Sequence, residues 1–538
     1  MMRQKMNLDG VWDFCWCGEE KPTFPMEFTE VTAVPGCFDV MEPHCGKRGW
    51  AVYRRVVEIG GKVKLSIDGV GLYGEVLWDN QPVGVCKYAY MPEEFWFDAG
   101  EEGNHELTVL LDNRHNDVFE PFFDFYGYGG IYGSVNVERV PEMPVTQMLI
   151  STEDVETGRI RVRAEAAGYC GKAWISFDTG CGGEHAFADG KLDVELCVPN
   201  FKIWDTEHPN MHTLTLKTET DTVSDSFGIR LFTTCGRKLL LNGKPIKLLG
   251  YNRHESHASM GAAVPVCQMA ADLKLMKDQG CNFVRGSHYP QRRGFLELCD
   301  RMGMLVWEET LGWGIQVERL HSPEFLEAQR EQVQKLTRMS FNNPSIAIRG
   351  FLNENDSRVE QTRPVIKALY DEIRAIDEHC LISFSSNKYQ KEVCTDLVDV
   401  VAMNPYPGWY DSTYENINTV DRIRPVLQQL SDDMPKDRPF LITELGAEAI
   451  YGFRDPLKTR WSEEYQAQLL EEACRYALES EDCAGITMWH FSDARSYVNG
   501  PHIYGRARGF NNKGVLDEFR RPKLSWYVLK QLFQGLKK

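Results

Sequence analysis

Residues 346–354 have the sequence Ile-Ala-Ile-Arg-Gly-Phe-Leu-Asn-Glu, and residues 440–444 have the sequence Phe-Leu-Ile-Thr-Glu. Both are short, mostly apolar runs that lie between longer segments of helical period. Such runs, when polar residues bound them, are typical of buried parallel β-strands. Glu354 and Glu444 are therefore each predicted to lie at the carboxyl end of a strand.

The same alternation of apolar runs and helical segments extends from residue 244 to the C-terminus. The predicted strands are 246–250, 282–286, 304–308, 346–353, 381–385, 398–404, 440–444 and 485–490. The predicted helices are 268–279, 291–302, 322–340, 363–378 and 462–479. This order is typical of a (β/α)8 barrel, which needs about 250 residues and carries its active site at the carboxyl ends of its strands. Glu354 then follows the fourth strand and Glu444 the seventh, nearly across the barrel mouth.

The first part of the chain has a different pattern. Residues 51–59, 62–67, 73–79 and 105–112 alternate apolar and polar side chains between Gly, Asp and Asn turns. This pattern predicts an all-β region. Prolines at 141 and 144 and the segment 233–236 suggest two boundaries, which give domains 1–140, 141–233 and 234–538. A chain of 538 residues is long enough for three or four domains of about 150 residues.

Several short motifs occur in a fixed order along nearly the whole chain. They are Asn252-Arg253-His254-Glu255, Ser287-His288-Tyr289-Pro290, Asn343-Pro344-Ser345, Asn353-Glu354, Asn404-Pro405-Tyr406-Pro407-Gly408-Trp409-Tyr410, Ile442-Thr443-Glu444 and Trp461-Ser462-Glu463-Glu464-Tyr465-Gln466. Together they resemble glycoside hydrolase family 2, and within it most closely the β-glucuronidases. The resemblance implies a multidomain fold: a jelly-roll sugar-binding domain, an immunoglobulin-like β-sandwich and a catalytic TIM barrel.

The resemblance also implies a role for each glutamate. Glu354 matches the family's general acid/base, and Glu444 matches its nucleophile. In retaining glycosidases two such carboxyl groups lie about 5 to 5.5 Å apart and act through a covalent glycosyl-enzyme intermediate. Asn353 matches the residue that bonds the sugar's 2-hydroxyl. No cofactor and no metal is needed for this reaction.

The segment Asn511-Asn512-Lys513 matches the Asn-x-Lys motif with which the family's uronidases bind the substrate carboxylate. A lysine ammonium supplies a compact charge and an asparagine amide a directional donor, so Asn511 and Lys513 suit a carboxylate. Further residues are expected from the resemblance alone. They are Asp124 and His288 on the sugar hydroxyls, Tyr406 and Tyr410 near the nucleophile, and Trp489 at the floor of the pocket.

Departures from the β-glucuronidases leave the substrate open. Ala507 stands where they carry an arginine, between Arg506 and Arg508, and Leu445 stands where they carry a tyrosine. We expect a β-glucuronidase, with a β-galacturonidase that uses the same carboxylate clamp as the alternative. A β-galactosidase would leave Lys513 without a carboxylate to bind. A non-catalytic carbohydrate-binding protein is disfavoured because both glutamates are present.

Composition limits the partners. Lys and Arg number 60 against 78 Asp and Glu, and the net charge of -18 disfavours nucleic acid and anionic membranes as partners. We find no signal peptide and no apolar run that could span a bilayer. The sixteen cysteines have no regular spacing, which indicates free thiols and a cytoplasmic protein. The expected partner is a small uronide, and the resemblance implies a homo-oligomer.

Overall fold

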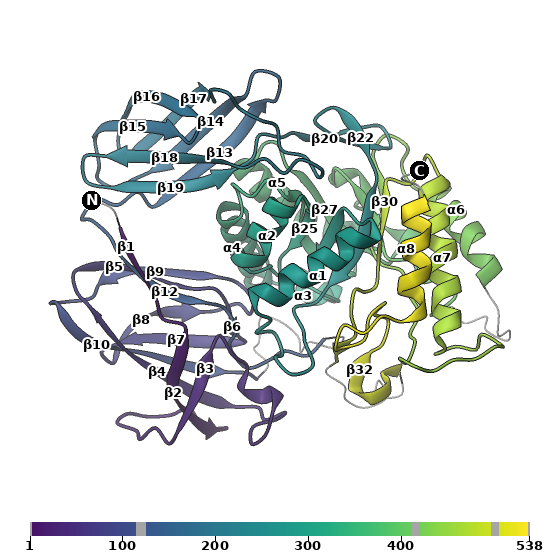
Figure 1. The fold of residues 1–538 in the computed structure, drawn as a ribbon, viewed down its shortest axis with the longest axis horizontal. Helices are drawn as coiled ribbons and strands as arrows, with labels where there is room; N and C mark the ends of the chain where they lie inside the picture. The colour runs from purple at the N-terminus through teal and green to yellow at the C-terminus, as the bar shows by residue number, and fades with distance from the viewer. Residues whose placement is uncertain (1–2, 115–124, 411–419, 497–504, 536–538) are drawn as a thin grey trace.

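The computed structural model describes residues 3–114, 125–410, 420–496 and 505–535. Two β-sandwiches precede a barrel, and both lie along the same side of it (Figure 1). Both also contact the segment around the barrel helix α4 (Pro323–Met339). Glu93 of the first sandwich pairs with Lys335, and the backbone N–H of Ile150 in the second donates to Asn342.

The first sandwich contains two antiparallel sheets. In sheet order, the larger contains β3 (Glu30–Val34), β2 (Gly10–Gly18), β4 (Trp50–Ile59), β10 (Gly103–Asp112), β7 (Tyr73–Trp78) and β8 (Gln81–Cys86). The smaller contains β1 (Gln4–Asn7), β12 (Val135–Arg139), β5 (Lys62–Ile67) and β9 (Glu93–Asp98), and a separate pair consists of β6 (Val70–Gly71) and β11 (Gly130–Ile131). A core that includes Trp12, Tyr53 and Leu65 fills the space between the sheets. The four strands predicted here are confirmed as β4, β5, β7 and β10.

The second sandwich follows from Gln147 onward. One sheet contains β13 (Gln147–Asp154), β14 (Arg159–Glu165) and β17 (Lys191–Cys197), and the other contains β16 (Gly180–Phe187), β15 (Gly171–Phe177), β18 (His212–Thr218) and β19 (Thr222–Phe227). A small sheet of β20 (Phe232–Cys235), β21 (Lys238–Leu241) and β22 (Lys244–Ile246) precedes the barrel. The domain boundaries at 140 and 233 stay a prediction.

The barrel is closed by eight parallel strands. They are β23 (Leu248–Arg253), β24 (Phe283–Gly286), β25 (Leu305–Glu309), β26 (Ile346–Asn353), β27 (Leu381–Ser386), β28 (Val401–Met403), β29 (Phe440–Ile442) and β30 (Gly485–Met488). Every residue of these strands except Leu249 is buried, because helices cover one face and the barrel interior the other. The eight predicted strands are confirmed, with β26 fourth and β29 seventh.

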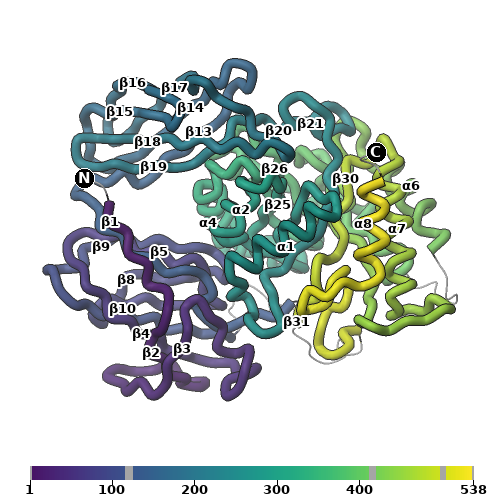
Figure 2. The backbone as a smooth tube through the Cα atoms, in the orientation of Figure 1, coloured from purple at the N-terminus to yellow at the C-terminus, as the bar shows by residue number. Residues whose placement is uncertain are grey.

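Helices surround the barrel. They are α1 (Val266–Gln279), α2 (Arg293–Met302), the short α3 (Val317–Leu320), α4, α5 (Arg363–Ile376), α6 (Ile423–Asp433), α7 (Glu463–Glu479) and α8 (Leu524–Gly535). The predicted helices match α1, α2, α4, α5 and α7 to within two residues at each end. The side chains of Ser322 and Ser462 cap α4 and α7 by accepting the backbone N–H three residues on. The final helix, α8, packs beside α7 and α1 (Figure 2).

Candidate active site

The carboxyl ends of the barrel strands bring Glu354 and Glu444 to one mouth. Glu354 directly follows β26, and Glu444 lies two residues beyond the end of β29. Glu444 is buried, whereas Glu354 is half-buried and has a backbone φ of +54°. A positive φ is unfavourable for a residue with a Cβ and is found disproportionately at functional sites. The hydrogen bond from the Glu354 N–H to the Ser385 carbonyl, 2.8 Å long, helps to hold this conformation.

Each carboxylate oxygen of Glu444 accepts a hydrogen bond. Arg285 Nη1 donates to Oε1 at 2.8 Å, and the Tyr406 hydroxyl donates to Oε2, also at 2.8 Å. Charge-assisted hydrogen bonds of this kind stabilise a carboxylate and fix its orientation. Burial and the charge of Glu444 raise the pKa of Tyr406 well above its usual value, so this hydroxyl stays a donor.

Arg285, on β24, is held by more than Glu444. Its Nη2 lies 2.9 Å from Glu309 Oε2 and 2.9 Å from Asn353 Oδ1, and its Nη1 lies 2.9 Å from Asn252 Oδ1. The guanidinium is fully buried, so two carboxylates and two amides replace the water that it has lost. Arg285 therefore links the end of the second strand to the ends of the first, third, fourth and seventh.

Glu354 has a neutral partner. Asn404 Nδ2, just beyond β28, donates to Glu354 Oε1 at 3.0 Å and lies 3.1 Å from Asn353 Oδ1. Asn404 Oδ1 accepts from the Thr443 hydroxyl at 2.7 Å, next to Glu444 in the chain. The amide N–H can donate a hydrogen bond to a carboxylate or to a protonated carboxyl group. Glu354 can therefore keep this partner both when it acts as an acid and when it acts as a base. The two glutamates are thus connected through Asn404.

Asn353 presents a donor that has no acceptor among the described residues. Its side chain is buried, and Oδ1 accepts from Arg285 and Asn404, which fixes the direction of the amide. Its Nδ2 is buried without a hydrogen-bond partner. Buried N–H groups are nearly always paired in folded proteins, so an orphaned one at a catalytic mouth suits a ligand hydroxyl.

Aromatic rings form one wall of the mouth. Trp489, directly after β30, is buried and stacks on His288 with ring centroids 5.0 Å apart and planes 17° apart. His288 Nδ1 lies 2.8 Å from Glu309 Oε1, which makes Nδ1 the donor, and Nε2 lies 3.7 Å from Glu444 Oε1. Burial lowers the pKa of the adjacent His490 well below its usual value, and the His254 and Lys513 charges act in the same direction. The wall is therefore mostly apolar ring surface, and the His288 nitrogen atoms are among its few polar groups.

Lys513 is buried beside this wall, in a cluster with Glu448, Tyr410 and Arg506. The Lys513 residue is 1% exposed, and its ammonium donates to Glu448 Oε1 and to the Tyr410 hydroxyl, both at 2.9 Å. Arg506 joins the same two partners, with Nη1 at 3.0 Å from Glu448 Oε1 and Nη2 at 3.4 Å from the Tyr410 hydroxyl. Two cations therefore converge on one carboxylate and one phenol.

The two arginines that flank Ala507 differ in direction. Arg508 donates to Glu518 Oε1 at 2.8 Å and to Asn512 Oδ1 at 2.8 Å, so it faces the turn and not the Lys513 cluster. Asn511 is fully buried and its Oδ1 accepts from the Lys513 N–H at 3.3 Å. It lies on β32 (Phe510–Asn511), paired with β31 (Ala494–Arg495) just beyond Trp489.

Most of the predicted site residues lie at this mouth. Hydrogen bonds, ring contacts or close approaches connect Glu354, Glu444, Asn353, His288, Tyr406, Tyr410, Trp489, Asn511 and Lys513 within one network. The exception is Asp124, which lies outside the described residues. The segment after β25 also reaches the mouth, since Trp313 forms an isolated β-bridge with Asn353.

The barrel and the sandwich before it each match a family. Residues 233–538 match the description "Glycosyl hydrolases family 2, TIM barrel domain", and residues 154–230 match "Glycosyl hydrolases family 2". The chain belongs to glycoside hydrolase family 2. It is a glycoside hydrolase, and the predicted family and fold class are confirmed.

Two kinds of relative resemble this family 2 enzyme. The beta-glucuronidase of Mus musculus is 28% identical over 77% of this chain and 65% of its own length, so the chain spans less than two thirds of it. The beta-glucuronidase of Streptococcus agalactiae is 25% identical over 97% of this chain and 94% of its own. A solved GH2 beta-galacturonidase from Eisenbergiella tayi, bound to galacturonate, is 31% identical with a TM-score of 0.90 and covers 99% of this chain and 97% of that one.

Four residues of the site were not predicted: Arg285, Glu309, Asn404 and Glu448. A signal exists for the first two, because a charged residue inside a buried barrel strand needs a partner. Asn404 belongs to a quoted motif, but only the structure gives it a role. Glu448 carries no sequence signal, since it lies in a loop four residues after Glu444.

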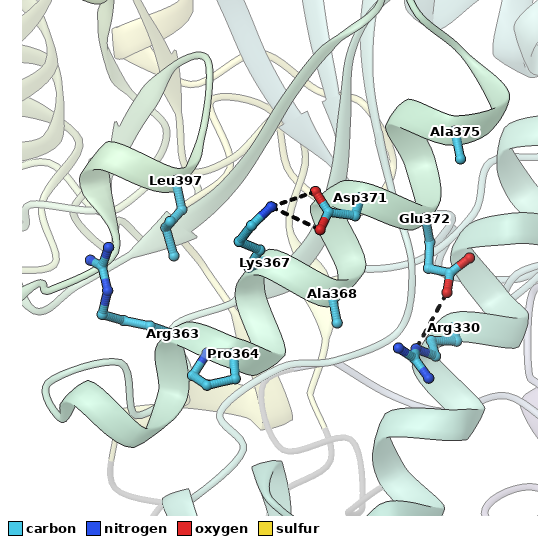
Figure 3. A pocket seen from close by; sticks show the side chains of 9 residues that line it. All are labelled: Arg330, Arg363, Pro364, Lys367, Ala368, Asp371, Glu372, Ala375 and Leu397. Atoms are coloured by element: carbon cyan, nitrogen blue, oxygen red, sulfur yellow. Dashed lines mark hydrogen bonds and ion pairs between the residues drawn. The ribbon is translucent and has the colours of Figure 1, made fainter.

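A groove elsewhere on the family 2 enzyme is not part of this site. It runs along α5 on the outside of the barrel, where Lys367 pairs with Asp371 and Arg330 pairs with Glu372 (Figure 3). Among the described residues, no helix is long and apolar enough to cross a membrane, and no group of His, Cys, Asp and Glu could hold a metal ion. No disulfide links the cysteines of the described residues.

Proposed function

We propose that this family 2 enzyme is a retaining β-D-hexuronidase that hydrolyses terminal β-glucuronides. The Lys513 cluster is the observation that carries the proposal. A buried ammonium and the Arg506 guanidinium converge beside the catalytic mouth, where a neutral sugar would offer them nothing. A C5 carboxylate placed between them and the Asn511 amide would gain charge-assisted hydrogen bonds. The names of the relatives, beta-glucuronidase and beta-galacturonidase, support the same substrate class.

The reaction proceeds in two displacements. A Glu444 oxygen attacks the anomeric carbon while Glu354 gives its proton to the departing glycosidic oxygen. Glu354, now a carboxylate, then takes a proton from a water that attacks the same carbon and releases Glu444. Arg285 loses one charged partner when Glu444 becomes an ester, but Glu309 still pairs with the guanidinium. The buried cation is therefore never left without a counter-charge.

The neighbouring residues position the sugar. Asn353 Nδ2 donates to the 2-hydroxyl, a contact that strengthens in the transition state. Trp489 stacks on His288 at the floor of the pocket and so orients the imidazole, whose Nε2 bonds a sugar hydroxyl near Glu444. Arg506, not Arg508, is the arginine of the carboxylate clamp because it shares Glu448 and Tyr410 with Lys513.

A β-galacturonidase is the second candidate. It is favoured by the 31% identity to the structure bound to galacturonate, over 99% of this chain. The two sugars differ only at the 4-hydroxyl, so the carboxylate clamp and the catalytic pair serve both.

The test is the initial rate on p-nitrophenyl β-glucuronide, β-galacturonide and β-galactoside. We expect turnover of the uronides, with their ratio deciding the 4-hydroxyl preference. Lys513→Met should lower kcat/KM for the uronide about a hundredfold, because removing one partner of a buried charge pair costs several kcal/mol. A preference of the wild type for the galactoside would refute the uronidase assignment.

The matched pair Arg506→Met and Arg508→Met tests the clamp assignment. Both replace an arginine on the same short turn, but only Arg506 reaches the Lys513 cluster. We expect Arg506→Met to lower kcat/KM for the uronide about tenfold, and Arg508→Met to leave it within about twofold. Equal effects of the two variants would remove Arg506 from the clamp.

A further inference from the structure

A second lysine lies on the other side of the catalytic pair from Lys513. Lys388 belongs to the loop after β27, the fifth barrel strand, and its Nζ lies 3.3 Å from the backbone oxygen of Glu354. Its side chain is half-buried. Burial lowers the pKa of Lys388, and the nearby charges of Glu354 and Asp356 oppose that shift. The cation is therefore held next to the proposed acid at a cost in solvation.

The charged groups that face Lys388 have other partners. Asp356 forms a two-bond pair with Arg358, at 2.7 and 3.0 Å. Glu392 accepts hydrogen bonds from the hydroxyls of Ser357 and Ser386. Among the described residues, no carboxylate forms an ion pair with Lys388. Its ammonium donates instead to a backbone carbonyl.

The position of Lys388 relates it to the leaving group. The proposed carboxylate clamp lies beyond the seventh and eighth strands, where Lys513 and Arg506 both pair with Glu448. Glu354 must reach the glycosidic oxygen, so the leaving group extends from Glu354 toward the loops of the fourth and fifth strands. Lys388 lies in the loop after the fifth strand and contacts the backbone of Glu354, so it is on this side of the mouth.

Protonation of Glu354 removes one of the negative charges near Lys388. In the state that is ready to cleave, Glu354 carries a proton and offers no negative charge to the adjacent ammonium. An anionic group on the leaving group would supply that charge in both the ground state and the transition state.

We propose that Lys388 binds an anionic group of the aglycone, so that the preferred substrates are uronides linked to an acidic unit that carries a carboxylate or sulfate near the glycosidic oxygen. This inference rests on the proposed hexuronidase function and extends it to the leaving group.

The proton and the charge balance through the cycle. When the bond between the anomeric carbon and the glycosidic oxygen breaks, its electron pair stays on that oxygen, which takes the proton of Glu354. A lone pair of Glu444 forms the new bond to carbon. Glu354 is then a carboxylate beside Lys388, where it competes with the anionic leaving group for the ammonium. This competition favours release of the leaving group before water attacks.

The test compares phenyl, 3-carboxyphenyl and 3-sulfophenyl β-uronides, together with the methyl ester of the carboxyphenyl compound as a neutral isostere. The wild type should prefer both anionic aglycones to the ester. Lys388→Met should lower kcat/KM for the anionic substrates about tenfold more than for the ester, as the loss of one half-buried charge contact implies. Lys388→Arg should keep most of the preference. Lys391→Met removes an exposed lysine of the same loop and should leave kcat/KM for all of these substrates unchanged.

Each other outcome has a definite meaning. Equal losses for anionic and neutral aglycones in Lys388→Met, with a shifted basic limb of the kcat profile, would overturn the inference and assign Lys388 to the tuning of Glu354. A preference for the carboxylate alone or the sulfate alone would identify which anion the site accepts. Failure of the wild type to cleave any uronide would instead overturn the proposed function, which the neutral phenyl compound tests by itself.

Discussion

The second sandwich and the mouth of the barrel place their ion pairs in opposite environments. On the sandwich, Arg161 and Asp193 form a two-bond pair at 2.7 Å across an open sheet face, with side chains 34% and 51% exposed. In the barrel, Arg285 pairs with Glu309 and Glu444, and none of these side chains is more than 5% exposed. The two regions use the same kind of contact under different solvation.

The difference explains where the chemistry lies. An exposed pair contributes about 0 to 1 kcal/mol because water competes for both partners. A buried pair is costly to form, and breaking it by removing one partner costs about 3 to 5 kcal/mol. The barrel therefore concentrates fixed charge at its mouth, where a reaction can use it. The sandwich charges mainly keep its surface solvated.

The largest effect is expected at Glu444. Glu444→Gln should reduce kcat at least about 10⁴-fold, because an amide cannot attack the anomeric carbon. The amide oxygen can still accept from Arg285, so circular dichroism and the melting temperature should change little. Glu354→Gln is the control, with a smaller loss on p-nitrophenyl substrates because their leaving group needs less protonation. If the Glu444→Gln variant kept near wild-type activity, Glu444 could not be the nucleophile.

An intermediate effect is expected at Glu308, a buried barrel carboxyl that no catalytic step uses. Burial raises the pKa of Glu308 from 4.5 to about 7, against the opposing influence of Arg349 and the Ser340 hydroxyl. The folded state thus binds this proton more tightly than the unfolded chain. The Glu308 contribution to stability is therefore fully present below pH 4.5 and is lost as pH rises toward 7.

Glu308→Gln tests this sign, because the amide cannot lose a proton. Relative to wild type, the variant's free energy of unfolding should rise by up to about 3 kcal/mol between pH 4.5 and pH 7. Urea unfolding of both proteins at pH 5, 6 and 7 measures the difference. If the free energies of unfolding of the two proteins changed in parallel with pH, Glu308 would not titrate in that range in the folded protein.

The smallest effect is expected on the sandwich. A double-mutant cycle of Arg161→Met and Asp193→Asn should give a coupling energy of at most about 1 kcal/mol. The coupling should also decrease when NaCl is added, since salt screens exposed charges. A coupling energy of several kcal/mol would mean that this exposed pair is as strong as the buried pairs of the barrel mouth. Thermal unfolding in low and high salt provides the measurement.

Much of the fold could be predicted from periodicity. Buried barrel strands are short apolar runs, and the helices between them keep a period of 3.6, so both signals are local. Helix α6 is not among the predicted helices, and Pro425 lies in its first turn, where a proline removes no helical hydrogen bond. The final helix α8 was likewise not among the predicted helices.

The candidate site could be predicted only in part. Glu354, Glu444 and Lys513 belong to recognisable motifs, and the structure brings them to one mouth. The choice between Arg506 and Arg508 could not be made from sequence, because both lie on one turn and only its backbone directs them to different partners. Asp124 stays a prediction, since it lies outside the described residues.

The sequence by itself determined the family, the order of sandwich and barrel, and the two strand ends that carry the glutamates. These follow from local periodicity and from motif residues in a fixed order. Only the tertiary structure decided the partners: Arg285 and Tyr406 on Glu444, Asn404 on Glu354, and Glu448 between Lys513 and Arg506. Those contacts join residues far apart in the chain. The charge environment of a side chain depends on distance in space, which sequence separation does not record.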